Sequence, residues 1–122
     1  MKVLQINSVS GIKSTGKICL ETAKLLKKNG DECLIIFGRE TASAEADEFS
    51  VKIGNIFTNV LHYIRYIITD DDGKGSYFPT KKAIKIIEKY NPDLIHLHNL
   101  HGHYINSHML LEYIQKKKIP VI

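Results

Sequence analysis

The sequence predicts an α/β fold, a Rossmann-like doubly wound parallel sheet, from three observations. Short apolar runs alternate along the chain with longer segments whose apolar residues recur at helical spacing. A glycine-containing loop joins the first apolar run to the first helical segment. Strand and helix signals then alternate to the end, which favours parallel strands joined by right-handed crossovers. We therefore treat residues 1–122 as one domain.

The elements of the first half follow from apolar runs and one helix stop signal. The run CLIIF at 33–37 is continuous, as in strands that are buried on both faces of a parallel sheet. Gly30 marks the end of the first helix, because glycine readily takes the left-handed conformation that closes a helix. The expected elements are strands at 2–7, 33–37 and 50–53, a helix at 16–29 and a polar loop at 38–48.

The second half predicts three further helices. Pro79 is expected at the first position of the second of them, and Ser107 is expected to cap the third. The expected elements are helices at 55–68, 79–90 and 107–117, strands at 94–98 and 120–122, and an acidic turn at 70–76. The helix at 55–68 has an apolar stripe of Phe57, Leu61, Ile64 and Ile68 and an exposed neighbouring face of His62, Tyr63 and Tyr66.

Charge, cysteine content and the N-terminal residues indicate which partners, sites and location to expect. The formal net charge is +4, and no basic patch carries interleaved aromatic residues, so we expect no nucleic-acid partner. The basic excess favours anionic lipid or phosphate-bearing ligands. The two cysteines lack the spacing of a zinc site or a disulfide framework. Residues 1–4 lead into a strand without the apolar segment of a signal peptide, so we expect a cytoplasmic protein.

The segment GIKSTGK at 11–17 follows the first strand and opens a helix, which is where an α/β domain binds phosphate. The P-loop pattern fails at Ile18, where a hydroxyl is needed to hold magnesium. The dinucleotide pattern fails at Lys13, where a glycine is needed, and no acidic residue ends the second strand to bind a ribose. A nucleotide or sugar-phosphate site, a degenerate P-loop and a simple tight turn remain open.

Five histidines fall within thirteen residues: His96, His98, His101, His103 and His108. In a strand, His96 and His98 project to the same face. His98 and Asn99 lie at the carboxyl end of that strand, the edge at which open α/β sheets bind ligands. Three interpretations remain open here: neutral histidines that hydrogen-bond a polar substrate, a zinc site, and loop histidines without a role.

Three segments together resemble the N-terminal domain of family 4 glycosyltransferases of the colanic-acid and capsule type. They are MKVLQIN at 1–7, Gly11 followed by STGK at 14–17, and DLIHLHNLHG at 93–102. The segment IPVI at 119–122 is similar to a later strand of such proteins. The similarity covers essentially the whole chain, and the histidine-rich segment is its most specific part.

The resemblance implies an enzyme with a GT-B fold, of which this chain is the N-terminal half. It implies a hexosyltransferase that moves a sugar from a nucleotide-diphosphate sugar to a saccharide or lipid-linked saccharide with retention of configuration, without a metal or other cofactor. It implies a donor-phosphate loop of Gly11, Ser14, Thr15 and Gly16 and an acceptor cleft of His98, Asn99 and His101. It places the catalytic residues and the donor-binding domain beyond residue 122, so that this chain is expected to be the front part of a longer polypeptide and inactive alone.

Such enzymes often act on lipid-linked acceptors at the inner face of the membrane, in the synthesis of bacterial surface polysaccharides. The resemblance therefore implies a peripheral membrane contact, with candidates at Lys81, Lys82, Lys85 and Lys89 beside the Tyr63 and Tyr66 face. A solvated helix face explains the same lysines. Two other classes remain as alternatives: a stand-alone, non-catalytic domain that binds a sugar or nucleotide, and a degenerate P-loop protein.

Overall fold

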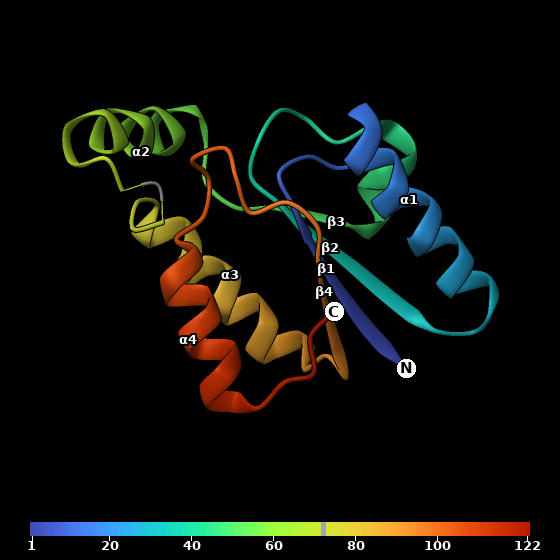
Figure 1. Cartoon of the computed structure of the whole chain (residues 1–122). Coiled ribbons are helices and arrows are strands. Elements are labelled where there is room, and N and C mark those ends of the chain that lie inside the picture. Colours follow the sequence, from blue (N-terminus) through green and yellow to red (C-terminus); the bar gives the residue numbers. More distant parts are fainter. Residues whose placement is uncertain (72) are drawn as a thin grey trace.

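A computed structural model describes residues 1–71 and 73–122 and confirms the α/β class. The sheet has four parallel strands in the order β3-β2-β1-β4 (Figure 1). They are β1 (Lys2–Asn7), β2 (Glu32–Phe37), β3 (Ser50–Lys52) and β4 (Leu94–Leu97). The helices are α1 (Lys13–Lys28), α2 (Ile56–Thr69), α3 (Tyr77–Tyr90) and α4 (Ser107–Lys117), with a 3-10 helix, η1 (Ala44–Phe49). Asp72, for which the sequence predicts an acidic turn, lies outside the described residues.

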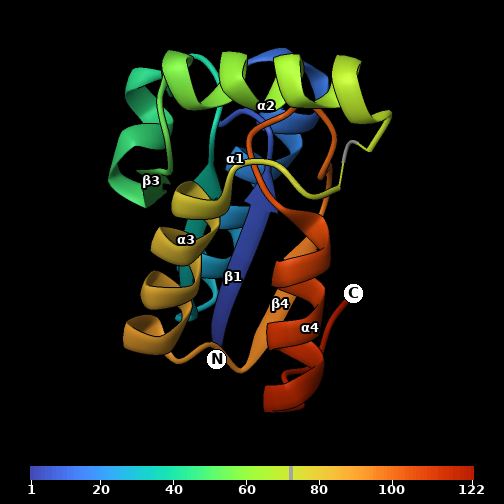
Figure 2. The same ribbon diagram turned by 90° about the vertical axis from the view of Figure 1, so that its left-hand side faces the viewer.

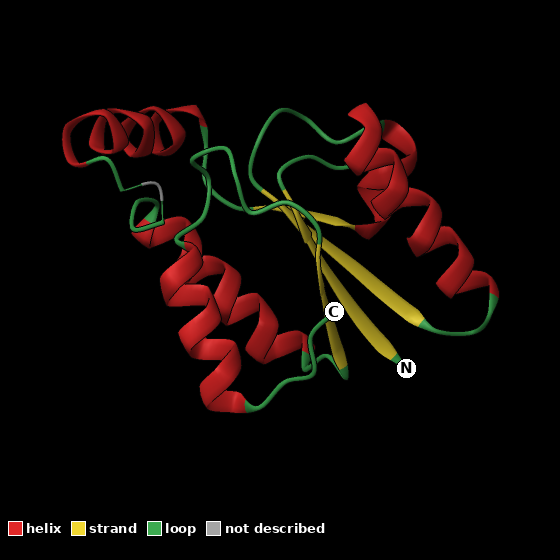
Figure 3. Ribbon diagram, in the orientation of Figure 1, coloured by secondary structure: helices red, strands yellow, loops and turns green. Residues whose placement is uncertain are grey.

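Helices cover both faces of the sheet, as Figures 1 and 3 show. α1 and η1 pack on one face, where Cys19, Ala23 and Ile35 are fully buried. α3 and α4 pack on the other face, and the larger core lies there. Its buried residues are Leu4, Ile6, Ile36, Ile53, Ala83, Ile87, Ile95, Tyr104, Ile105, Leu110 and Ile114. Burial on both faces explains why the segment CLIIF of β2 is a continuous apolar run.

The expected strand at 120–122 pairs with β4 through a short stretch of backbone. Ile95 N donates to Pro120 O at 2.9 Å, and Ile122 N donates to Ile95 O at 3.0 Å. A parallel bridge joins Ile95 to Val121. The segment therefore extends the sheet beyond β4.

Two helix starts and one helix cap differ from the expectations, whereas α4 has the expected bounds of 107–117. α1 begins at Lys13, three residues earlier than expected, so that Ser14, Thr15 and Gly16 lie in its first turn. α3 begins at Tyr77, which puts Pro79 at its third position, where its missing N–H is again one that needs no partner within the helix. Asn106 caps α4 in place of Ser107, because its side chain accepts from Met109 N at 2.9 Å.

The expectation for the faces of α2 is wrong. α2 lies level with the carboxyl-terminal end of the sheet, on the side of α3 and α4 and above them, instead of packing on a face of the sheet (Figures 1 and 2). The expected apolar stripe is exposed, with Phe57 and Ile68 each at 76%. His62 is only 2% exposed, and its Nδ1 lies 2.9 Å from Ser76 Oγ.

The physical reason is the loop before α3, which packs against the other face of α2. A Cβ at Gly75 would come within 2.0 Å of His62 Cδ2, so the absence of a side chain at Gly75 makes room for the imidazole. The His103 ring completes this packing, 5.3 Å from the His62 ring and 5.2 Å from the Tyr66 ring. α2 is therefore held by a small contact around His62, and its apolar stripe faces solvent.

This arrangement predicts unequal losses of stability for two matched isoleucine substitutions. Ile87→Ala in α3 is expected to lower the free energy of unfolding by about 2–5 kcal/mol, because it leaves a cavity in the core. Ile68→Ala in α2 is expected to change it by less than about 0.5 kcal/mol, because the side chain is exposed. Urea unfolding of both variants measures this difference. An equal loss in both would show that the apolar stripe of α2 is packed in solution.

Candidate functional site

The glycine loop and the histidine segment both lie at the carboxyl edge of the sheet. β2 and β3 lie on one side of β1, and β4 lies on the other, so the strand order reverses between β1 and β4. Ligands of open α/β sheets bind in the crevice at such a switch point. His98 N donates to Ile6 O at 3.0 Å, which places His98 beside the end of β1. The predicted donor-phosphate and acceptor residues are thus brought to one edge.

The loop after β1 is held by internal hydrogen bonds. Asn7 is fully buried, and its Nδ2 donates to Val9 O at 2.8 Å and to Thr15 Oγ1 at 3.2 Å. Gly11 N donates to Gly16 O at 3.0 Å. A Cβ at Gly11 would overlap Ser43 Oγ at 1.9 Å, and the backbone there is left-handed at φ 70°. Of the predicted loop residues, Gly11, Thr15 and Gly16 therefore shape the loop, and the Ser14 side chain is exposed.

The first turn of α1 is an uncapped positive end of a helix. No side chain accepts a hydrogen bond at its N-cap, Ile12, and no acidic residue lies in the first turn. The free N–H groups of a first turn carry a partial positive charge that attracts phosphate. Lys13 stands where the dinucleotide pattern has a glycine, and its backbone is left-handed at φ 54°. Its ammonium forms an ion pair with the Glu40 carboxylate after β2.

The helix start also bears on the P-loop alternative. A P-loop wraps a phosphate with the backbone of several loop residues that precede its helix. Here residues 13–17 are already helical, so only a short turn is left between β1 and α1. Ile18, which replaces the magnesium-binding hydroxyl, is exposed on α1. The geometry therefore favours contact through the helix end over a P-loop cradle.

A buried amide orients the imidazole of His98. Gln5 is fully buried in β1, and its Nε2 donates to Cys19 O at 2.9 Å and to Cys33 Sγ at 3.2 Å. Its Oε1 lies 2.8 Å from His98 Nε2. Because an amide oxygen only accepts, the hydrogen-bond network assigns the proton of His98 to Nε2 and leaves a lone pair on Nδ1.

The surroundings keep His98 neutral. Burial lowers the pKa of His98 below that of a free imidazole, and the neighbouring His96 lowers it further. The two rings stack with their centroids 3.9 Å apart. Burial also lowers the pKa of His96. At neutral pH, His98 is therefore a hydrogen-bond acceptor at Nδ1 in a fixed orientation.

A pocket of about 520 Å³ opens beside His98. It is also lined by His101 and His108, so the structure brings two of the three predicted acceptor residues together. Asn99 does not line it. Its Oδ1 accepts from His101 N at 2.9 Å and its backbone oxygen accepts from Tyr104 Oη at 2.6 Å, so Asn99 shapes the loop that carries His101.

Two structural findings bear on other expectations for the chain. Among residues 1–71 and 73–122, no three His, Cys, Asp or Glu side chains stand close enough to hold a metal ion together. In the same part of the chain, no helix is both long enough and apolar enough to cross a bilayer.

Sequence reasoning missed Gln5, although a signal for it was present. Gln5 is the polar residue inside the otherwise apolar run VLQI. A polar side chain in a strand that is buried on both faces needs partners from neighbouring elements. The pattern alone could have marked Gln5 as a residue that orients another group, but not which group.

No protein-family model matches this chain, and neither the curated proteins nor the solved structures give a significant match to it. The fold and the geometry of the edge between β1 and β4 thus carry the functional argument.

The Gln5–His98 pair predicts the tautomer and the titration of His98. Nitrogen-15 NMR is expected to show the Nε2–H form, with a pKa below the usual value of about 6.5. In Gln5→Glu, a carboxylate accepts the same proton and is expected to raise that pKa. A wild-type Nδ1–H tautomer would contradict the assignment.

The lowered pKa values of His96 and His98 also give a direction for stability. As the pH falls below about 6.5, the unfolded chain binds protons before the folded one does. Their contribution to the free energy of unfolding is therefore complete above that pH and declines as the pH falls toward the folded pKa values. His98→Gln is expected to reduce this slope, and urea unfolding at a series of pH values measures it. An unchanged slope would argue against a buried neutral imidazole.

Proposed function

We propose that this chain is the N-terminal, acceptor-side half of a retaining GT-B glycosyltransferase. In this proposal a hexose moves from a nucleotide-diphosphate sugar to a saccharide or lipid-linked saccharide in bacterial surface-polysaccharide synthesis. The observation that carries it is that the uncapped start of α1 and the oriented His98 both lie at the carboxyl edge of the sheet. The resemblance of the segments at 1–7, 11–17 and 93–102 supports the same class.

The two parts of this edge have complementary tasks in the proposed reaction. The N–H groups of the first turn of α1 stabilise the negative charge that develops on the departing nucleoside diphosphate. Such stabilisation needs no metal. His98 Nδ1 accepts a hydrogen bond from a hydroxyl of the acceptor and orients it toward the sugar. The remaining catalytic groups and the donor-binding domain are proposed to lie beyond residue 122, so this chain alone does not turn over.

A substitution at Ser14 tests the role of the helix end. Ser14→Glu puts a negative charge in the first turn of α1, where it stabilises the helix but repels a phosphate. We expect uridine, guanosine or adenosine diphosphate to shift the amide resonances of residues 12–16 in the wild type. In Ser14→Glu we expect the dissociation constant to rise by at least about tenfold, since like charges are brought together.

Ser14→Gln is the matched control, because it adds similar bulk without charge. It is expected to bind nucleoside diphosphate nearly as well as the wild type does. Thermal unfolding of Ser14→Glu is expected at the same or a higher temperature, which separates lost binding from lost folding. Equal binding by Ser14→Glu and Ser14→Gln would overturn the proposed phosphate contact.

We also propose a peripheral contact with the inner face of the cytoplasmic membrane. α2 exposes a large apolar surface and contains no acidic residue. Tyr77 and Phe78 of α3 continue this surface, and Lys81 Nζ lies 4.7 Å from the centre of the Tyr77 ring. Apolar, aromatic and cationic side chains side by side suit an anionic lipid interface. The exposed apolar residues of α2 are Ile56, Phe57, Val60, Leu61, Tyr63, Ile64, Ile67 and Ile68.

Phe57→Glu tests this contact without disturbing the helix, since a glutamate is favourable in a first turn. We expect the wild type to sediment with vesicles that contain phosphatidylglycerol more than with phosphatidylcholine vesicles. Phe57→Glu is expected to weaken binding by at least about tenfold, because one buried aromatic side chain contributes about 1.5–3 kcal/mol.

Leu25→Glu on α1 is the control, because Leu25 is also exposed but lies away from α2. It is expected to bind vesicles as the wild type does. Equal binding of Phe57→Glu and the wild type would contradict the membrane contact. A concentration-dependent dimer that Phe57→Glu abolishes would instead assign the surface to a second copy of the chain.

A further inference from the structure

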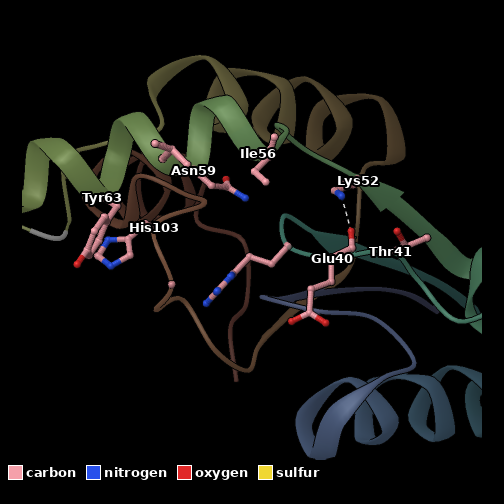
Figure 4. A pocket seen from close by; sticks show the side chains of 10 residues that line it. Glu40, Thr41, Lys52, Ile56, Asn59, Tyr63 and His103 are labelled. Carbon is pink, nitrogen blue, oxygen red and sulfur yellow. Dashed lines mark hydrogen bonds between the residues drawn. The ribbon is translucent and has the colours of Figure 1, made fainter.

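A second pocket, larger than the one beside His98, lies outside the predicted site. It has a volume of about 680 Å³ and opens at the carboxyl edge, between the loop after β2, the start of α2 and the loop at 102–103. Figure 4 shows Lys52 and Glu40 at one end and Tyr63 with His103 at the other, with Asn59 reaching down from α2 between them. A volume of this size fits a small ligand such as a monosaccharide.

The charged end of the pocket has an excess of positive charge. The Glu40 carboxylate is neutralised by its ion pair with Lys13. Lys52 Nζ donates to the backbone oxygen of Glu40, and no carboxylate of residues 1–71 and 73–122 forms an ion pair with it (Figure 4). Among residues 1–71 and 73–122, no carboxylate pairs with Arg39, whose side chain is exposed. An anion placed here would meet two cations.

The loop at Gly102 gives Arg39 its position. A Cβ at Gly102 would come within 2.8 Å of Arg39 Nη1 and 3.0 Å of its Cδ, so the guanidinium stem lies directly against the glycine backbone. Gly102 also has a left-handed backbone at φ 105°, which favours glycine. A guanidinium offers paired N–H donors that match the two oxygens of a carboxylate.

The other end of the pocket suits a sugar ring. The Tyr63 ring lies 5.3 Å from the His103 ring, and together they form an aromatic wall. Asn59 Nδ2 donates to Gly38 O at 3.0 Å, which fixes the amide at the pocket. Its Oδ1 has no hydrogen-bond partner within the described residues and is an acceptor that a hydroxyl could satisfy.

We propose that this pocket binds a carboxylate-bearing sugar, a uronic acid residue, with its carboxylate on Arg39 and its ring against Tyr63. The proposed function is needed only to name this sugar as part of the acceptor; the binding itself stands on the pocket. Arg39 provides selectivity, since a charged hydrogen-bonded pair is stronger than the contacts of a neutral hydroxymethyl group. Lys52 adds charge at the same end of the pocket.

The experiment compares two sugars that differ only at the carboxylate. The nitrogen-15-labelled chain is titrated with methyl glucuronoside, methyl glucoside and inorganic phosphate, and the amide shifts of residues 39, 63 and 102 are followed. The glucuronoside is expected to bind at least about tenfold more tightly than the glucoside. Arg39→Gln is expected to remove this preference, whereas Lys28→Gln, which removes one charge at the exposed end of α1, is expected to keep it.

Three results would overturn the proposal. They are equal affinity for the two glycosides, an unchanged preference in Arg39→Gln, and no shift at residues 39, 63 and 102 with either sugar. Phosphate that binds as tightly as the glucuronoside would show a simple anion site and overturn the part played by Tyr63. The Ser14 experiment uses nucleoside diphosphates and reports on residues 12–16, so each proposal can fail while the other stands.

Discussion

A polar side chain that is buried inside a sheet needs a hydrogen-bond partner for each of its polar atoms. Gln5 has such partners in α1, in β2 and in the residue that follows β4. Its amide nitrogen bonds to the backbone of α1 and to a thiol of β2, and its oxygen accepts from His98 beyond β4. These bonds join the helix whose first turn faces the proposed phosphate to the histidine that faces the proposed acceptor. The relative position of the two halves of the candidate site therefore depends on an amide in the core and not on the loops that form the site's surface.

The fold class and most elements could be predicted from the sequence because the core determines them. The continuous apolar run of β2 and the spacing of Cys19 and Ala23 in α1 are both consequences of burial against the sheet. The face of α2 could not be predicted, since this helix has apolar residues on most of its circumference. Which face turns inward is decided by a distant contact, the fit of His62 over Gly75, which leaves no periodic signal.

The candidate site was predictable in part, for a similar reason. Residues that follow a strand closely, such as Gly11 in the loop after β1 and His98 directly after β4, are placed at the carboxyl edge by the strand itself. The start of α1 was predicted three residues too late, because its N-cap, Ile12, is not one of the residue types that commonly cap a helix. The wall of the larger pocket combines Arg39, Asn59 and Gly102, which come from three segments and meet only through the packing of α2 and two loops.

The small contact that holds α2 has a consequence for how this domain can diversify. The outward residues of α2 meet none of the packing constraints that fix the size and shape of side chains in the core. As long as His62, Gly75 beneath it, and Asn59, Tyr63 and Tyr66 keep their contacts, the outward residues of the helix can change without altering the sheet. The outer surface of α2 can therefore vary between related proteins, and with it the partners that this surface contacts, while the residues at the sheet edge stay the same.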